Sequence, residues 1–526
     1  MLRGALTAAV GAVVLVSGCA PRSEPASTEY SVEEKSLAAL QDDLAAGRVT
    51  SKRLVDLYLA RIRELDENGP ALRSVLAVNP RAADDARGLD AERAKGHVRG
   101  PLHGIPILVK DNIETADPLP TTAGSLALAK NVTGRDAPII VRLREAGVVI
   151  LGKANLSEWA NIRSVRSTSG WSAVGGLTRN PYALDRNPCG SSSGSGVAVA
   201  ASLAAMAVGT ETDGSITCPA AVNGIVGLKP TVGLLSRRHI IPISSMQDTA
   251  GPMTRTVADA AALLTVMAGS DEGDPATKEA DLHRADYSAG LSAGLAGKRV
   301  GVMRFAMGYL PTLDALFDQA VTQLEAAGAE VVTIDKFEGM DRINKDELTV
   351  LITDLRTELN AYLATTPATV PVRTLQDLIA FNKDHAAREM ANFAQDIFEQ
   401  SEGTAGHDQA AHTRLREGNR IAAGPNGIDA LLKAHRVDAL IAPTLGPAWT
   451  TDLVNGDRFI GGATTLPAVA GYPHLTVPMG QIRGLPVGLS FIGPAWSESM
   501  LLAMGYAFEQ RTSARKPPAY APGIEP

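Results

Sequence analysis

The sequence C-G-S-S-S-G-S-G begins at Cys189, runs into an alanine-rich segment, and is followed by G-T-E-T-D-G-S, which ends at Ser215. Upstream, the apolar segment G-I-P-I-L-V-K ends at Lys110. A serine nucleophile needs a base near its hydroxyl and backbone N–H groups that face the developing oxyanion. The pattern therefore predicts that Lys110 is the base and that the glycine-containing turn ending at Ser215 is the oxyanion hole.

Further motifs make the chain similar to the amidase signature family, whose members use a serine, a second serine after a cis peptide bond, and a lysine. These motifs are Q-D-T-A-G-P-M-T-R at 247–255, A-P-T at 442–444, G-Y-P-H-L-T-V-P-M-G at 471–480 and G-L-P-V-G-L at 484–489. Within the family the chain most resembles the bacterial peptide amidases, which remove the C-terminal amide from peptides. The features of that branch are Cys189, T-D-G-S at 212–215, and F-N-K-D-H-A-A-R-E-M at 381–390.

Carried over residue by residue, the resemblance implies that Ser215 is the nucleophile, Ser191 the bridging serine and Lys110 the base. The backbone N–H groups that it implies for the oxyanion hole are those of Thr212, Asp213, Gly214 and Ser215. The reaction would be hydrolysis of a carboxamide to a carboxylic acid and ammonia through an acyl-enzyme on Ser215. No cofactor is expected.

Lys110 can act as a base only if it loses its charge, because a free lysine has a pKa of about 10.4. The residues before it, Ile105 to Val109, are apolar and predict a buried ammonium with a lowered pKa. Our hypothesis is that neutral Lys110 takes the proton of Ser191 while Ser191 takes that of Ser215.

Other motifs carry less weight. G-S-S-S-G at 190–194 matches G-x-S-x-G and nominates Ser192, but that mechanism needs a histidine, and the nearest candidate, His474, lies in a segment that the family uses structurally. The sequence contains no zinc-binding or nucleotide-phosphate motif, so no metal is expected.

The side chain of Asp213 is expected to rigidify the turn that ends at Ser215 rather than to face the substrate.

The substrate is constrained by two positions after the nucleophile. Many members of the family carry an arginine there, and in some it holds a substrate carboxylate, whereas this chain has Thr217 and Cys218. These two residues are candidate substrate contacts, and their neutrality favours a peptide with an amidated end. A general aliphatic or aryl amidase is one alternative, and a catalytically inert binding lipoprotein is another. An ammonia-supplying amidotransferase subunit is disfavoured because it would work in the cytosol, whereas the N-terminus of this chain predicts export.

The N-terminus predicts export. Arg3, an apolar stretch and V-S-G-C ending at Cys19 resemble a bacterial lipoprotein signal, and the apolar stretch is too short for a permanent membrane span. We expect a signal peptide at 1–18, lipidation of Cys19 with anchoring to a membrane surface on the periplasmic or cell-surface side, a polar tether at 19–30, and a catalytic domain at 31–526. An ordinary cleaved signal remains the alternative.

The other two cysteines, Cys189 and Cys218, are expected to be free, partly buried thiols. Oxidising surroundings could join them, because both lie close to serines that must approach each other. A disulfide requires Cα atoms within roughly 7 Å, which a sequence does not reveal.

Composition describes an ordinary enzyme of 526 residues, with 45% hydrophobic residues and a formal net charge of −7. The charge is mild and unclustered, so nucleic acid is not an expected partner, and the oligomeric state is left open.

Helical and strand-like segments alternate, which is typical of an α/β fold. A capping box formed by Ser31 and Glu34 predicts the first helix. The strand-like runs are 105–109, 148–151, 298–303, 329–335, 438–442, 475–479 and 487–492. The resemblance implies one large domain with a mixed sheet of about eleven strands flanked by helices.

Overall fold

The computed structural model describes all residues except 3, 5–7, 9–29 and 525–526. Contacts divide the chain into two units, Met1–Ser31 and Val32–Pro526. Cys19 and nearly all of the expected signal and tether segments lie outside the described residues. The fold and the site described below belong to Val32–Pro526.

A mixed sheet of 11 strands forms the centre of this unit, in the order β1-β3-β2-β6-β8-β7-β12-β13-β11-β9-β10. In chain order its strands are β1 Val75–Val78, β2 Pro106–Lys110, β3 Val149–Ala154, β6 Met206–Glu211, β7 Val226–Lys229, β8 Thr249–Thr254, β9 Arg299–Met303, β10 Glu330–Ile334, β11 Ala439–Pro443, β12 His474–Ile482 and β13 Leu485–Ile492. A separate pair consists of β4 Trp171–Ser172 and β5 Gly176–Leu177. The predicted single α/β domain with about eleven strands is confirmed.

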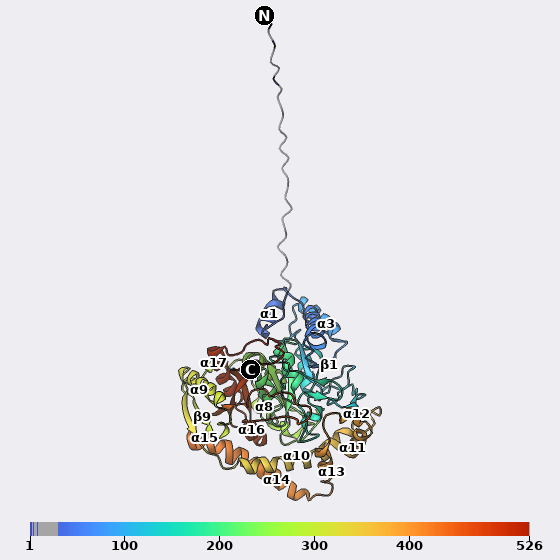
Figure 1. Cartoon of the computed structure of the whole chain (residues 1–526), viewed down its shortest axis with the longest axis vertical. Helices are drawn as coiled ribbons and strands as arrows, with labels where there is room; N and C mark the ends of the chain where they lie inside the picture. Colours follow the sequence, from blue (N-terminus) through green and yellow to red (C-terminus); the bar gives the residue numbers. More distant parts are fainter. Residues whose placement is uncertain (3, 5–7, 9–29, 525–526) are drawn as a thin grey trace. The chain divides into compact units, whose positions relative to one another are not determined.

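Helices flank the sheet, and α10 and α14 run alongside each other (Figure 1). The α-helices are α1 Leu37–Ala45, α2 Ser51–Arg61, α3 Ala82–Ala94, α4 Pro138–Glu145, α5 Ser193–Ala200, α6 Thr217–Val222, α7 Val257–Met267, α8 Ala280–His283, α9 Pro311–Ala326, α10 Met340–Leu363, α11 Leu375–Asp384, α12 Ala386–Glu389, α13 Asp396–Glu402, α14 Gln409–Ala423, α15 Asp429–His435, α16 Thr465–Ala470 and α17 Glu498–Thr512. Among the described residues, no helix combines the length and apolar character that a membrane span requires.

The first helix begins later than the sequence predicts. Its N-cap is Ser36, whose side chain accepts a hydrogen bond from the N–H of Ala39, and the helix starts at Leu37. Glu34 has a φ of 56° and therefore cannot continue a right-handed helix from Ser31. The predicted capping box of Ser31 and Glu34 is wrong, although the helix itself forms and buries Leu37, Leu40 and Leu44.

The pairing of β2 with β6 brings two of the candidate segments together. The two strands are parallel, with Val109 opposite Val208, so their C-terminal ends lie at the same edge of the sheet. Lys110 is the last residue of β2, and the turn that ends at Ser215 follows β6 directly. The sheet therefore places Lys110 beside the start of that turn.

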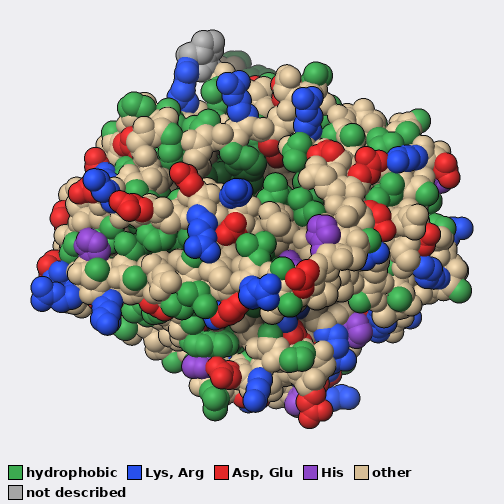
Figure 2. All heavy atoms as spheres, turned by 90° about the horizontal axis from the view of Figure 1, so that it is seen from below, with side chains coloured by type: hydrophobic (Ala, Val, Ile, Leu, Met, Phe, Trp, Pro, Cys, Tyr) green, Lys and Arg blue, Asp and Glu red, His purple; other side chains and the backbone are tan. Residues whose placement is uncertain are grey.

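Helix α5 lies between the two serine turns and packs closely against its neighbours. A Cβ atom on Gly194 would lie 2.5 Å from the carbonyl oxygen of Asn155, so only glycine permits this approach. Every residue of α5 is buried, which the small side chains of this serine-, glycine- and alanine-rich stretch permit. On the outer surface, Lys and Arg side chains are interspersed with Asp and Glu across the face seen in Figure 2.

Candidate active site

Lys110 is completely buried and contacts the second candidate serine. Its Nζ lies 2.8 Å from Ser191 Oγ, 2.7 Å from Thr210 Oγ1 and 3.2 Å from the carbonyl oxygen of Thr210. Burial lowers the pKa of Lys110 to about 7, and the negative charges of Glu211 and Asp248 act in the opposite direction. A substantial fraction of Lys110 is therefore neutral near pH 7, as a base requires.

The two serine turns are held together through their backbones. The peptide bond between Gly190 and Ser191 is cis, and the N–H of Ser192 donates to the carbonyl oxygen of Ser215 over 3.0 Å. The side chain of Ser192 donates to the carbonyl oxygen of Thr210 and accepts from the Thr210 N–H. Ser192 is thus occupied in joining the turn to β6, which excludes it as the nucleophile of a G-x-S-x-G motif.

The turn 212–215 presents backbone donors. Gly214 has a φ of 75°, a conformation that strains other residues. Across the described part of the chain, no protein group accepts a hydrogen bond from the N–H groups of 212–215. The next two N–H groups, of Ile216 and Thr217, donate to Glu211 Oε2 over 2.7 and 2.9 Å. Four consecutive donors therefore stay available to an oxyanion, while Glu211 fixes the start of α6 behind them.

Ser215 opens into a cavity of about 420 Å³. The turn 212–215 and Gly190 form one side of it. Leu351 of α10, Leu445 and Phe459 contribute apolar surface to its wall. Helix α10, which belongs to a region without signature motifs, thus takes part in the cavity wall. None of the described residues that line this cavity is a histidine.

Residues outside the predicted set fix the turn. Asp248 accepts a hydrogen bond from Thr212 Oγ1 over 2.6 Å, and Gln247 Nε2 donates to the carbonyl oxygen of Thr212 over 3.3 Å. Asp213 accepts a hydrogen bond from Thr465 Oγ1 over 2.7 Å, in keeping with its expected rigidifying role. Gln247 and Asp248 belong to the motif at 247–255, but no sequence signal indicates that this motif reaches the turn.

The histidine alternative has no geometric basis. His474 lies on β12, fully buried, with its Nε2 atom 2.6 Å from Ser490 Oγ. Burial and the positive charge of Lys229 lower the pKa of His474 to about 3, so its imidazole is neutral. It does not line the cavity at Ser215.

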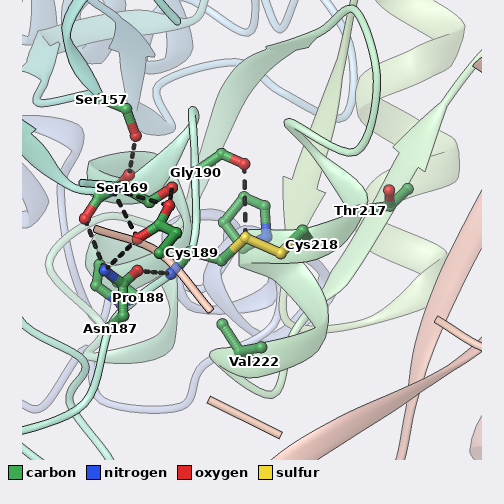
Figure 3. Close-up of a disulfide and its surroundings, with 12 residues drawn as sticks. Ser157, Ser169, Asn187, Pro188, Cys189, Gly190, Thr217, Cys218 and Val222 are labelled. Carbon is green, nitrogen blue, oxygen red and sulfur yellow. Dashed lines mark hydrogen bonds between the residues drawn. A yellow bond between two sulfur atoms is a disulfide. The ribbon is translucent and has the colours of Figure 1, made fainter. Parts of the chain in front are cut away.

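Thr217 and Cys218 differ from the prediction. Thr217 is completely buried, its hydroxyl lies 3.2 Å from Glu211 Oε2, and it does not line the cavity. Cys218 does line the cavity, but it forms a disulfide with Cys189, with Cα atoms 6.0 Å apart (Figure 3). The expectation of two free thiols is therefore wrong, because the close approach of the two serine turns also brings their flanking cysteines within bonding distance.

This disulfide closes a loop with a sequence separation of 29 and is expected to stabilise the fold. Replacing both Cys189 and Cys218 with alanine should lower the free energy of unfolding by about 3 to 4 kcal/mol, because the loop-closure entropy of the unfolded chain returns. Urea unfolding, measured with and without reductant, checks this. Reductant should destabilise the wild type and leave the double variant unchanged. Equal stability of the two proteins under oxidising conditions would contradict the bridge.

Comparison with known proteins agrees with this geometry. Residues 53–502 match the Amidase family. The native peptide amidase from Stenotrophomonas maltophilia is 52% identical, with a TM-score of 0.88, and the match covers 93% of this chain and 99% of that one. The peptide amidase PAM in complex with the competitive inhibitor chymostatin is 53% identical, with a TM-score of 0.89, over 92% of this chain and 99% of that one. A probable amidase of Arabidopsis thaliana is 40% identical over 97% of this chain and 96% of its own length. The chain therefore belongs to the amidase signature family of amide-hydrolysing enzymes.

Proposed function

We propose that this amidase hydrolyses the C-terminal amide of peptides to the free acid and ammonia, with Ser215 as its nucleophile. The observation that carries the proposal is the cavity at Ser215, which has apolar walls, four available N–H donors and no cation among the described residues that line it. Such a cavity suits a neutral chain end better than an amide that carries a carboxylate. The extended likeness to peptide amidases supports the same substrate class.

The proposed mechanism uses Lys110, Ser191 and Ser215 as one proton relay. Neutral Lys110 accepts the proton of Ser191, and Ser191 accepts that of Ser215 as its oxygen attacks the amide carbon. The N–H groups of 212–215 stabilise the oxyanion, and one such donor is typically worth roughly 100- to 1000-fold in rate. The relay then returns a proton to the leaving ammonia, and water hydrolyses the acyl-enzyme.

A panel of amides tests the substrate. An amidated peptide should be converted to its acid without internal cleavage, and an identical free-acid peptide should stay intact, as mass spectrometry can show. Turnover of small aliphatic or aryl amides alone would favour the general amidase. No observation favours an inert lipoprotein.

The pH dependence tests the base. Because only neutral Lys110 can accept a proton, and its pKa is lowered to about 7, kcat/KM for an uncharged peptide amide should rise with pH and level off above that value. Protonation at lower pH removes the base, so the rate should fall there. The check is a profile of kcat/KM from about pH 5 to pH 9, in which a flat line would count against Lys110.

We also propose that the protein is exported and anchored to a bacterial membrane through a lipid on Cys19. The disulfide between Cys189 and Cys218 supports export, because disulfides persist mainly in oxidising compartments. The likeness of residues 1–19 to a lipoprotein signal supports the anchor. Cys19→Ser should move the protein from the membrane to the soluble fraction with unchanged turnover, and a variant that stays with the membrane would refute the anchor.

A further inference from the structure

Asp213 is the one ionisable side chain among the described residues that line the cavity at Ser215. Its Oδ2 atom accepts the hydrogen bond from Thr465, whereas its buried Oδ1 atom accepts none from the N–H and hydroxyl groups of the described residues. The predicted role in rigidifying the turn therefore uses only one of its two oxygens. The other is left unexplained by the mechanism.

A second carboxyl group lies against Asp213. Glu347, from the middle of α10, contacts the Asp213 carboxyl and accepts a hydrogen bond from Gln247 Nε2 over 2.8 Å. Burial and the neighbouring negative charge hold the pKa of Glu347 well above its usual range. Burial raises the pKa of Asp213 as well, but hydrogen bonds with Thr464, Thr465 and Glu347 act in the opposite direction. Glu347 is therefore the partner that keeps a proton, and the pair carries one negative charge, centred on Asp213.

The other charged groups near the pair do not cancel this charge at the cavity. Lys229 is the cation that reaches Asp213 electrostatically, but it is completely buried on β7, its Nζ donates to the carbonyl oxygen of Pro230, and it does not line the cavity. Glu211 is also nearby and adds negative rather than positive charge. A ligand in the cavity consequently meets a carboxylate within two residues of the nucleophile.

We propose that Asp213, supported by Glu347, excludes carboxylates from the site and so determines specificity for neutral chain ends. This inference rests on the proposed peptide-amide function. The substrate amide is neutral, but its product is a carboxylate beside Asp213, and like charges in close contact disfavour binding strongly. The same repulsion disfavours a side-chain amide that sits next to a free C-terminal carboxylate. Asp213 thus promotes product release and discriminates between two kinds of amide.

The test compares binding of N-acetyl-phenylalanine amide with binding of its acid twin, N-acetyl-phenylalanine. Calorimetry in a Ser215→Ala background measures both without turnover. The acid should bind at least about tenfold more weakly than the amide when Asp213 is present, as expected for a close like-charge contact. Asp213→Asn should lower the ratio of the two dissociation constants by at least about tenfold. Asp213→Asn with Glu347→Gln should lower it at least as far, because the second change stops Glu347 from ionising once the charge on Asp213 is gone.

Two matched variants separate the effect of the Asp213 charge from the effect of replacing a carboxyl group elsewhere. Glu347→Gln removes the proton-sharing partner but keeps the charge on Asp213, so the ratio should stay high. Glu358→Gln makes the same change at a half-buried carboxyl, which lines a different cavity, and should also leave the ratio unchanged. An unchanged ratio in Asp213→Asn, or equal binding of acid and amide before substitution, overturns the proposal. If neither ligand binds, the peptide-amide function itself fails.

Discussion

Ser215→Ala is expected to abolish amide hydrolysis. Removing the nucleophile leaves no oxygen to form the acyl-enzyme, and losses of roughly a millionfold in kcat accompany such changes in serine hydrolases. The four N–H donors of 212–215 stay in place, so the variant should still bind an amide. Steady-state kinetics with an amidated peptide measures the loss.

Ser195→Ala is the matched control for this prediction. Ser195 is another buried serine of the same stretch, and its hydroxyl donates to the carbonyl oxygen of Val208 rather than to any group of the relay. Its replacement should leave kcat within about tenfold of the wild type, since a net hydrogen bond of this kind contributes only about 1 kcal/mol. Residual activity of Ser215→Ala at the level of this control would show that another residue attacks the substrate.

Lys110→Met should lower kcat by about 100- to 10,000-fold, the usual contribution of a general base. The long apolar side chain keeps most of the buried volume of lysine but removes the nitrogen that contacts Ser191. Lys153→Met makes the same change at a second fully buried lysine, whose Nζ contacts Thr121 Oγ1 over 2.8 Å outside the site. It should reduce stability but leave kcat nearly unchanged.

Combining Lys110→Met with Ser191→Ala should cost little more than either change alone, because residues of one relay act as a unit. Multiplicative losses would show that the two side chains act independently. A Lys110→Met enzyme with a normal rate would remove lysine from the mechanism. Both results come from the same kinetic measurements.

Much of the sheet follows from apolar runs, and all seven predicted runs correspond to strands. The strands that the sequence did not reveal are short or rich in residues that disfavour strands. β7 reads V-G-L-K and β8 reads T-A-G-P-M-T, so neither shows a continuous apolar or alternating pattern. They form because each pairs with neighbours in the middle of the sheet, which local sequence does not record.

The site, like the sheet, combines residues that the sequence predicts with residues that only the folded chain reveals. Lys110, Ser191 and Ser215 lie in motifs, and the structure brings their segments together. Glu347 comes from a helix without motifs and reaches the turn only through tertiary packing, so no local pattern could identify it. The disulfide likewise depends on a Cα separation of 6.0 Å that only the folded chain defines.

The most direct test of the central claim is to locate the acyl group during turnover. An activated ester of an N-acetylated peptide should acylate the enzyme faster than an amide does, so the intermediate can be quenched in acid and found by mass spectrometry of the digested protein. The acyl group is predicted on the fragment containing Ser215, and it should be absent from Ser215→Ala. An acyl group on Ser191 or Ser192, or its persistence in Ser215→Ala, would contradict Ser215 as the nucleophile.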